Sequence, residues 1–279
     1  MRLSSFSFVL ALLLPAGMVQ AQVDLHPGST HFTILQDDKA VGSSETTVTP
    51  TAAGYNIASH GDLKLSKFTY SFDNKQSLDH MLNLVNDKIT GTVNGSPVTF
   101  TVSSDPTGRE FHIDVNAQGK STQNTVDRHQ HLALLADLDS ASYMLLTRIG
   151  LENPRVSWVL IPKQDGLLVP SVYAQGANVR GRMDGKDVDV EHTTVTVSAQ
   201  NAVTVELFHT PDGQLLEADL PEQNFYVVRD GFKLIDRPKF GPPRSPEGSA
   251  PPPQQGVPPQ QGVPPQYSAP QSAPQPQQQ

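Results

Sequence analysis

The strongest candidate for metal chemistry in this sequence is a short polar segment with two histidines. His129 and His131 are two residues apart, and Asp127 lies two residues before the first of them. On an extended chain, neighbouring side chains at this spacing point to the same side, about 7 Å apart. Two imidazoles and a carboxylate can bind zinc or copper. A solvated polar loop between two strands would show the same pattern, so both interpretations stay open.

A second pair of residues could support acid–base chemistry. His112 and Asp114 share one face of a predicted strand, and a carboxylate at this spacing can orient the tautomer of a histidine. The solvated face of a half-buried strand would contain the same residue types. A hydrolase built on this pair together with His129 and His131 would need at least two of these segments to converge in one pocket.

Motifs for covalent catalysis and for nucleotide binding are absent from the sequence. There is no Gly-x-Ser-x-Gly nucleophile elbow, and no lysine has a serine three residues before it. The His-Glu-x-x-His zinc motif, the phosphate-binding glycine loop and the dinucleotide fingerprint are also missing. Because the chain has no cysteine, it has no disulfide, no thiolate metal site and no cysteine nucleophile. The sequence therefore predicts no cofactor.

The charge of the chain argues against two classes of partner. Lys and Arg total 20 against 28 Asp and Glu, a formal net charge of −8, and no basic stripe could follow a phosphate backbone. The same deficit of basic residues argues against electrostatic binding to anionic lipid. We therefore expect no nucleic-acid partner, and we interpret the acidity as a source of solubility.

The N-terminus has the pattern of a secretory signal. Arg2 precedes an almost entirely apolar segment over residues 6–16. Val19 and Ala21 then place small residues at the −3 and −1 positions of a cleavage site, so cleavage after Ala21 is predicted. No other segment approaches eighteen consecutive apolar residues, and the processed chain is not expected to span a membrane as a helix. The predicted location is periplasmic or secreted.

The C-terminus differs in composition from the rest of the chain. Of the 24 prolines, 13 lie after Phe240, and the hexapeptide Pro-Pro-Gln-Gln-Gly-Val at residues 252–257 is repeated directly afterwards. A segment with so few apolar side chains cannot bury a core, so residues 241–279 are predicted to be disordered with a polyproline II bias. This Pro/Gln-rich tail could be a spacer, could bind an envelope component, or could only increase solubility. The predicted organisation is a signal (1–21), one antiparallel β domain (22–240) and this tail.

The central part of the chain has the two-residue period of half-buried strands. Residues 98–102, 111–115 and 203–207 show it clearly, and residues 156–161 read as a strand covered on both faces. Four dipeptides typical of tight hairpin turns occur between such segments: Asn94-Gly95, Asp184-Gly185, Asp212-Gly213 and Asp230-Gly231. Such short connections leave no room for crossover helices. We expect a mainly β fold, with a large curved antiparallel sheet or a partly closed barrel or sandwich.

One short apolar helix is expected within this β domain. Asp139 or Ser140 can cap an apolar segment that ends at Gly150 and Pro154, with Arg148 in its last turn. A single apolar helix in an antiparallel protein normally covers a concave sheet or the end of a barrel, and it can leave a cavity beside it. The alternative is a helix that simply completes the core.

Several short motifs occur in a recognisable order. A first hairpin contains Val41-Gly42, residues 54–59 read Gly-Tyr-x-Ile-x-Ser, residues 139–146 read Asp-x-x-Ser-Tyr-x-Leu-Leu, and Phe225-Tyr226 lies near the end. Together they resemble a group of secreted bacterial β-domains of unknown function, over roughly residues 30–236. In some bacteria a similar domain precedes an α/β-hydrolase domain. The resemblance implies a curved antiparallel sheet, similar in outline to periplasmic lipoprotein-carrier folds, and brings no catalytic residues.

The leading functional hypothesis is a non-enzymatic domain that binds an apolar small molecule, a lipid or an envelope component in its concave face. The predicted lining residues are Trp158 and, on the expected helix, Tyr143, Met144 and Leu146. The aromatic side chains of Trp158 and Tyr143 combine apolar area with a polar group. Ordinary core packing would use the same residues. A cavity larger than a few hundred cubic ångströms beside the helix would support binding. The alternatives are an adaptor that binds cell-envelope proteins through the sheet surface and the tail, and an undetected hydrolase.

Overall fold

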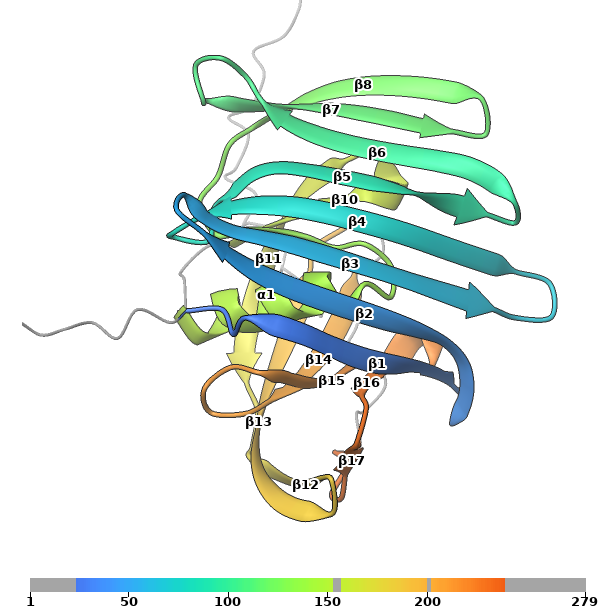
Figure 1. Ribbon diagram of the computed structural model, residues 1–279, viewed down its shortest axis with the longest axis vertical. Coiled ribbons are helices and arrows are strands. Elements are labelled where there is room, and N and C mark those ends of the chain that lie inside the picture. The colour runs from blue at the N-terminus through green and yellow to red at the C-terminus, as the bar shows by residue number, and fades with distance from the viewer. Residues whose placement is uncertain (1–23, 153–156, 200–201, 239–279) are drawn as a thin grey trace, which may run out of the picture. The chain divides into compact units, whose positions relative to one another are not determined.

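The structure is a computed structural model that describes residues 24–152, 157–199 and 202–238. These residues form a mainly β fold (Figure 1). The predicted signal at residues 1–21 and the predicted disordered tail at residues 241–279 lie outside the described residues. Within the described ranges, no helix has the length and apolar character needed to cross a lipid bilayer.

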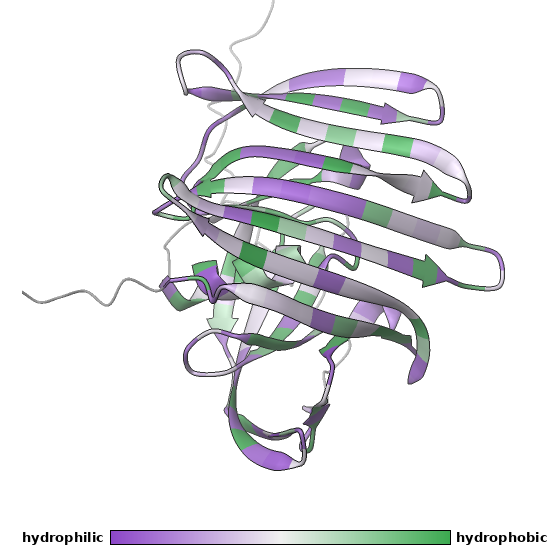
Figure 2. Ribbon diagram, viewed as in Figure 1, coloured by the Kyte–Doolittle hydropathy of each residue, from purple (hydrophilic) through white to green (hydrophobic). Residues whose placement is uncertain are grey.

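The first half of the domain is a meander of eight long strands. Each strand pairs antiparallel with the next one along the chain. The strands are β1 (Gly28–Gln36), β2 (Lys39–Thr51), β3 (Gly54–Lys64), β4 (Thr69–Asp79), β5 (Leu84–Val93), β6 (Ser96–Ser104), β7 (Glu110–Ala117) and β8 (Lys120–Asp127). Figure 2 shows hydrophobic and hydrophilic residues alternating along these strands, as the two-residue period predicted.

The second half of the domain adds shorter strands and the helix. Its elements are β9 (Leu132–Leu134), α1 (Ser140–Glu152), β10 (Ser157–Ile161), β11 (Leu167–Gln175), β12 (Val179–Met183), β13 (Lys186–Val197), β14 (Val203–His209), β15 (Leu215–Leu220), β16 (Phe225–Arg229) and β17 (Phe232–Leu234), with short 3₁₀ turns η1 (Pro162–Gln164) and η2 (Pro221–Gln223). All four predicted turn dipeptides lie between consecutive strands, and their glycines have positive φ angles.

The two halves form one continuous sheet. β1 pairs with β16 as well as with β2, and pairing continues through β15, β14, β13, β11 and β10 to β9. The first part of β13 pairs instead with β12, which also pairs with β17. In the described residues, β8 at one end pairs with β7 alone and β9 at the other end pairs with β10 alone. The prediction of a large, mainly antiparallel sheet is confirmed, and the sheet does not close into a barrel.

One strand pair differs from the predicted antiparallel arrangement. β9 and β10 run parallel, with Trp158 opposite Leu132. Parallel neighbours need a crossover connection, and α1 is that connection. The sequence argument that left no room for a crossover helix is therefore wrong at this one position, because the predicted helix itself makes the crossover.

The helix is confirmed, but it ends later than predicted. α1 begins at Ser140 and continues to Glu152, so Gly150 and Arg148 lie before its last residues. A Cβ atom at Gly150 would lie 2.9 Å from Cδ1 of Tyr173, which is too close for an unshifted contact. Gly150 therefore allows close packing against β11, and it does not end the helix. Pro154 lies outside the described residues.

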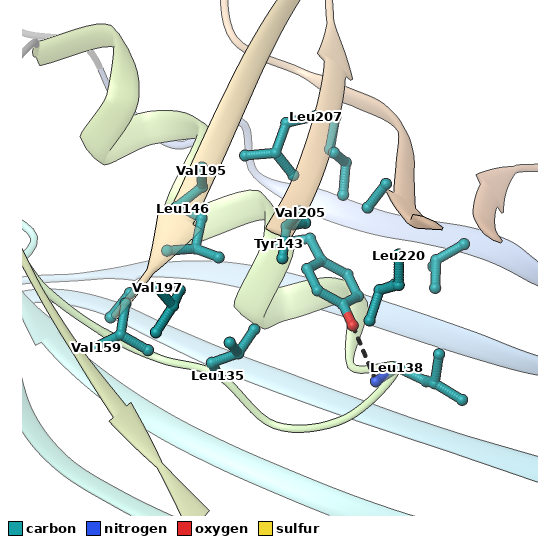
Figure 3. Close-up of a cluster of buried hydrophobic side chains, with 14 of the residues drawn as sticks. Leu135, Leu138, Tyr143, Leu146, Val159, Val195, Val197, Val205, Leu207 and Leu220 are labelled. Atoms are coloured by element: carbon teal, nitrogen blue, oxygen red, sulfur yellow. Dashed lines mark hydrogen bonds between the residues drawn. The ribbon is translucent and has the colours of Figure 1, made fainter. Parts of the chain in front are cut away.

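The helix lies between two hydrophobic clusters. It contacts β2 and β3 in the meander, and β13, β14 and β15 in the second half. Tyr143 and Leu146 pack with Val195 and Leu207 in one cluster (Figure 3), whereas Leu145 packs in the other cluster with side chains of the meander. The adjacent strand β10 likewise contributes to both clusters, which confirms the prediction of a strand covered on both faces.

The N-terminus of α1 is attached to the concave face of the meander by buried polar side chains. Oδ1 of Asp139 accepts a hydrogen bond from the backbone N–H of Ala141 at 3.0 Å, and its Oδ2 accepts one from Asn74 Nδ2 at 2.9 Å. The Ser140 hydroxyl lies 2.7 Å from that of Ser44 and 2.6 Å from that of Thr46. These contacts satisfy polar groups that the first turn of a buried helix would otherwise leave unpaired.

Two buried carboxyl groups lie in this region. Burial raises the pKa of Asp139, although hydrogen bonds from Asn74, Ser59 and the helix partly offset this effect. Burial also raises the pKa of Asp87 on β5 well above its usual value, and the carboxylate of Asp139 adds to the effect. The side chain of Gln76 opposes this rise only in part. The charged form of Asp87 is therefore strongly disfavoured in the folded state.

We expect Asp87→Asn to stabilise the protein at pH 7 by about 1–3 kcal/mol, because an amide leaves no charge to bury. The raised pKa means that the folded state binds more protons than the unfolded state. The advantage of Asp87→Asn over the unaltered chain in the free energy of unfolding should therefore grow as pH rises above about 3.9, the pKa of an unfolded aspartate. Urea denaturation from pH 4 to pH 9 measures both effects.

The control for this prediction is Asp73→Asn, which changes an exposed aspartate on the neighbouring strand β4. We expect this change to alter the free energy of unfolding by less than about 0.5 kcal/mol. An Asp87→Asn variant that is less stable than the unaltered chain across this pH range would contradict the assignment of Asp87 as a destabilising buried acid.

Candidate ligand-binding cavity

A cavity of about 460 Å³ lies at the N-terminal end of α1. One wall consists of residues from β3 to β7 and from the turn between β3 and β4. The other consists of the loop residues 136–138, of residues in and after the turn η1, of the last residue of η2 and of the first residue of β16. Most of the lining side chains are apolar or aromatic, and they include Leu63, Tyr70, Ile89, Val98, Phe100 and Phe225. Both the volume and the lining are typical of sites for small molecules.

The strand pairing explains why these side chains line one space. Ile89, Phe100 and Val115 are direct partners on the three neighbouring strands β5, β6 and β7. Leu63 and Tyr70 are paired in the same way on β3 and β4. Partners in register point to the same face of a sheet, so these rows form a continuous apolar surface on the concave side.

The helix positions the opposite wall. Leu138, which lines the cavity, donates its backbone N–H to the hydroxyl of Tyr143 at 3.1 Å (Figure 3). The backbone N–H of Ala136, also in the lining, donates to the Ser142 hydroxyl at 3.1 Å. The loop before α1 is therefore held in place by side chains from the first turn of the helix.

A few polar groups interrupt the apolar lining. Nζ of Lys163 lies 2.7 Å from Oδ1 of Asp137, and both side chains are partly exposed. Asp165 also lines the cavity and is exposed. Burial raises the pKa of Tyr70, and the carboxylates of Asp137 and Asp139 raise it further. The Tyr70 hydroxyl therefore stays protonated at neutral pH.

An exposed aromatic side chain also contributes to the cavity. Phe68 lies in the turn between β3 and β4, lines the cavity and is 37% exposed. Its carbonyl accepts a hydrogen bond from the backbone N–H of Leu65 at 2.8 Å, which closes the turn. A large apolar side chain that is both exposed and part of a cavity wall is suited to contact an apolar ligand at the entrance.

The four residues predicted to line the site are not part of this cavity. Tyr143 and Leu146 are completely buried in the core, and Tyr143 contributes indirectly by holding Leu138. The ring of Trp158 stacks on that of His129, with the centroids 4.1 Å apart. Met144 lines a separate, smaller cavity of about 50 Å³ together with Arg148.

The structure does not assemble the predicted metal ligands. His129 stacks on Trp158, whereas Nδ1 of His131 lies 3.2 Å from a carboxylate oxygen of Glu152. Asp127 lies at the end of β8, opposite Glu110. No group of three or more histidine, aspartate or glutamate residues within the described ranges is placed to hold a metal ion.

The residues considered for a hydrolase also lie outside the cavity. His112 and Asp114 are exposed on β7. Asp114 accepts a hydrogen bond from Gln123 Nε2 at 2.7 Å, and Nδ1 of His112 lies 3.4 Å from the Thr125 hydroxyl. These contacts connect neighbouring positions of β7 and β8 on the solvated face of the sheet.

A second group of buried charges lies on β14 and β15. Arg237 forms short ion pairs with Glu217 and Asp219, both of which are 1% exposed. Burial, followed by repulsion from Glu217, raises the pKa of Asp219 to about 9, and Arg237 opposes this rise. On the neighbouring strand, Glu206 lies 2.7 Å from Nε2 of His192. The contacts of Arg237 attach the segment that follows β17 to the sheet.

Comparison with known proteins identifies the fold but not the activity. No protein-family model matches this sequence, and no match is found among curated proteins. A β-barrel-like protein of the domain of unknown function DUF1849 from Brucella abortus matches with a TM-score of 0.52 and 9% identity, over 77% of this chain and 100% of that one. The chain shares this β-barrel-like fold. A DUF1089 family protein from Pseudomonas aeruginosa gives a TM-score of 0.41 and 10% identity, over 80% and 98%.

Two matched substitutions on β6 test whether the cavity is open space. Val98 lines the cavity, whereas Val102 on the same face of the strand is 1% exposed and packed in the core. We expect Val98→Phe to change the free energy of unfolding by less than about 1 kcal/mol, and Val102→Phe to reduce it by about 1–3 kcal/mol through overpacking. Denaturant unfolding measures both values, and equal destabilisation would contradict an open cavity.

Proposed function

We propose that this protein binds an apolar small molecule or a lipid in the cavity between β3–β7 and the loops around α1. The observation that supports this proposal is a space of about 460 Å³ with a mostly apolar lining. Soluble proteins seldom leave an apolar hollow of this size open to solvent unless it binds a ligand or a partner. A stable cavity with apolar walls and a few polar groups is therefore best explained as a binding site.

We also propose that binding takes place outside the cytoplasm, in the periplasm or after secretion. The support is the signal pattern that ends at Val19-Gln20-Ala21. Expression in a bacterium with an intact secretion system should give a periplasmic protein that begins at Gln22, as measured by intact mass. The variant Ala21→Trp should keep the segment, because the −1 position needs a small residue. A cytosolic protein that keeps residues 1–21 would contradict the proposed location.

Binding can be tested with Nile red, an uncharged apolar dye whose fluorescence increases in an apolar environment. We expect the full chain to bind the dye with saturation, and we expect Val98→Phe to weaken this binding at least about tenfold, because the new ring occupies the cavity. The matched control is Val172→Phe, which adds the same ring at a site that is 62% exposed and outside the cavity.

The natural ligand can be sought by native mass spectrometry and solvent extraction of the protein purified from the periplasm. A near-stoichiometric apolar mass that is lost in Val98→Phe would support the proposal. Equal dye binding by the unaltered chain and Val98→Phe, together with a protein free of ligand, would reject it. The adaptor hypothesis would then be favoured, since β8 is an exposed strand with only β7 as a partner in the described residues.

A further inference from the structure

The charges at the cavity point to the chemical class of the ligand. Lys163 is the single lysine or arginine that lines the cavity in the described part of the chain, and its ammonium group is already 2.7 Å from Asp137. Asp165 adds a second carboxylate to the lining. With two carboxylates against one ammonium group, the lining has an excess of negative charge. An incoming carboxylate would be repelled and would have to displace Asp137 from Lys163.

The cavity wall also contains a polar group without a hydrogen-bond partner in the described part of the chain. The hydroxyl of Tyr70 has no hydrogen-bond partner among the described residues, although the side chain lines the cavity. A protonated phenol can donate a hydrogen bond to an oxygen atom of a ligand. The phenol oxygen can also accept a hydrogen bond from an ammonium group, but Asp137 is already paired with Lys163 and the other carboxylate, Asp165, is exposed. Within the described lining, no free buried carboxylate therefore compensates for the hydration that an ammonium head group would lose in the cavity.

We propose, resting on the proposed function, that the ligand is an uncharged amphiphile: an apolar chain with one neutral oxygen acceptor, such as an alcohol or an ester. The apolar walls contact the chain, and the Tyr70 hydroxyl donates to the oxygen. A neutral head group loses far less hydration free energy in the cavity than a carboxylate or an ammonium ion does. The ion pair of Lys163 and Asp137 then stays intact.

Four probes with the same twelve-carbon acyl or alkyl chain test this proposal: 1-dodecanol, methyl dodecanoate, dodecanoate and dodecylammonium. Each competes with Nile red for the full chain at neutral pH, below its own aggregation concentration. We expect the alcohol and the ester to displace the dye at concentrations at least about tenfold lower than either charged probe, which corresponds to about 1.4 kcal/mol.

Two variants separate the contributions of charge and of hydrogen bonding. Asp137→Asn removes a carboxylate and frees Lys163, so dodecanoate should bind several times more tightly while the affinity for dodecanol stays constant. Tyr70→Phe removes only the hydroxyl, so dodecanol should bind about three to ten times more weakly. Tyr173→Phe is the matched control, because it removes a tyrosine hydroxyl that lies outside this cavity.

The outcomes distinguish this inference from the proposed function on which it rests. If the binding of Nile red does not depend on Val98 and the purified protein is free of ligand, the proposed function fails. If the dye binds, but a charged probe displaces it as well as dodecanol does, the cavity remains a binding site and the inference is wrong. The inference is also wrong if none of the four probes displaces the bound dye, or if Asp137→Asn leaves the affinity for dodecanoate unchanged.

Discussion

The attachment of the helix N-terminus to the concave face of the meander is the constraint on which the rest of the domain depends. A buried helix leaves its first N–H groups without backbone partners, so side chains must satisfy them. Asp139 does this for Ala141 and also bonds to Asn74 of β4, while Ser140 lies against the hydroxyls of β2. These bonds fix where α1 starts. They therefore fix the loop that precedes it and the crossover from β9 to β10.

The cavity follows from the different sizes of the helix and the sheet. A helix of 13 residues is roughly 20 Å long and about 10 Å wide. The eight strands of the meander are about 4.8 Å apart, so they extend over roughly 34 Å, and β2 alone has 13 residues. One helix cannot cover such a surface. The second half of the domain covers most of the remainder, and the uncovered apolar rows that contain Ile89 and Phe100 line the cavity.

The features that depend on local sequence could be predicted, and those that depend on curvature could not. The strand period, the four turns and the helix are local, and all were found in the structure. Tyr143 and Leu146 were chosen as lining residues because they are apolar and helical, but α1 is packed on both sides, so its apolar faces meet side chains and not open space. The strands β3–β7 that line the cavity have the same alternation as any packed strand. No pattern in the sequence predicts that Asp87 is buried either.

Two of the unfavourable buried acids lie next to the cavity, and this proximity supports a functional interpretation. Asp87 is two residues from Ile89 on the inward face of β5, and Asp139 directly follows Leu138; both apolar neighbours line the cavity. Buried acids lower stability at neutral pH, and natural proteins keep such costs mainly where function needs them. Asp139 fixes the start of the helix that positions one wall of the cavity, and Asp87 faces the same region. The domain is therefore less stable at neutral pH because of acids in the region where the cavity is formed.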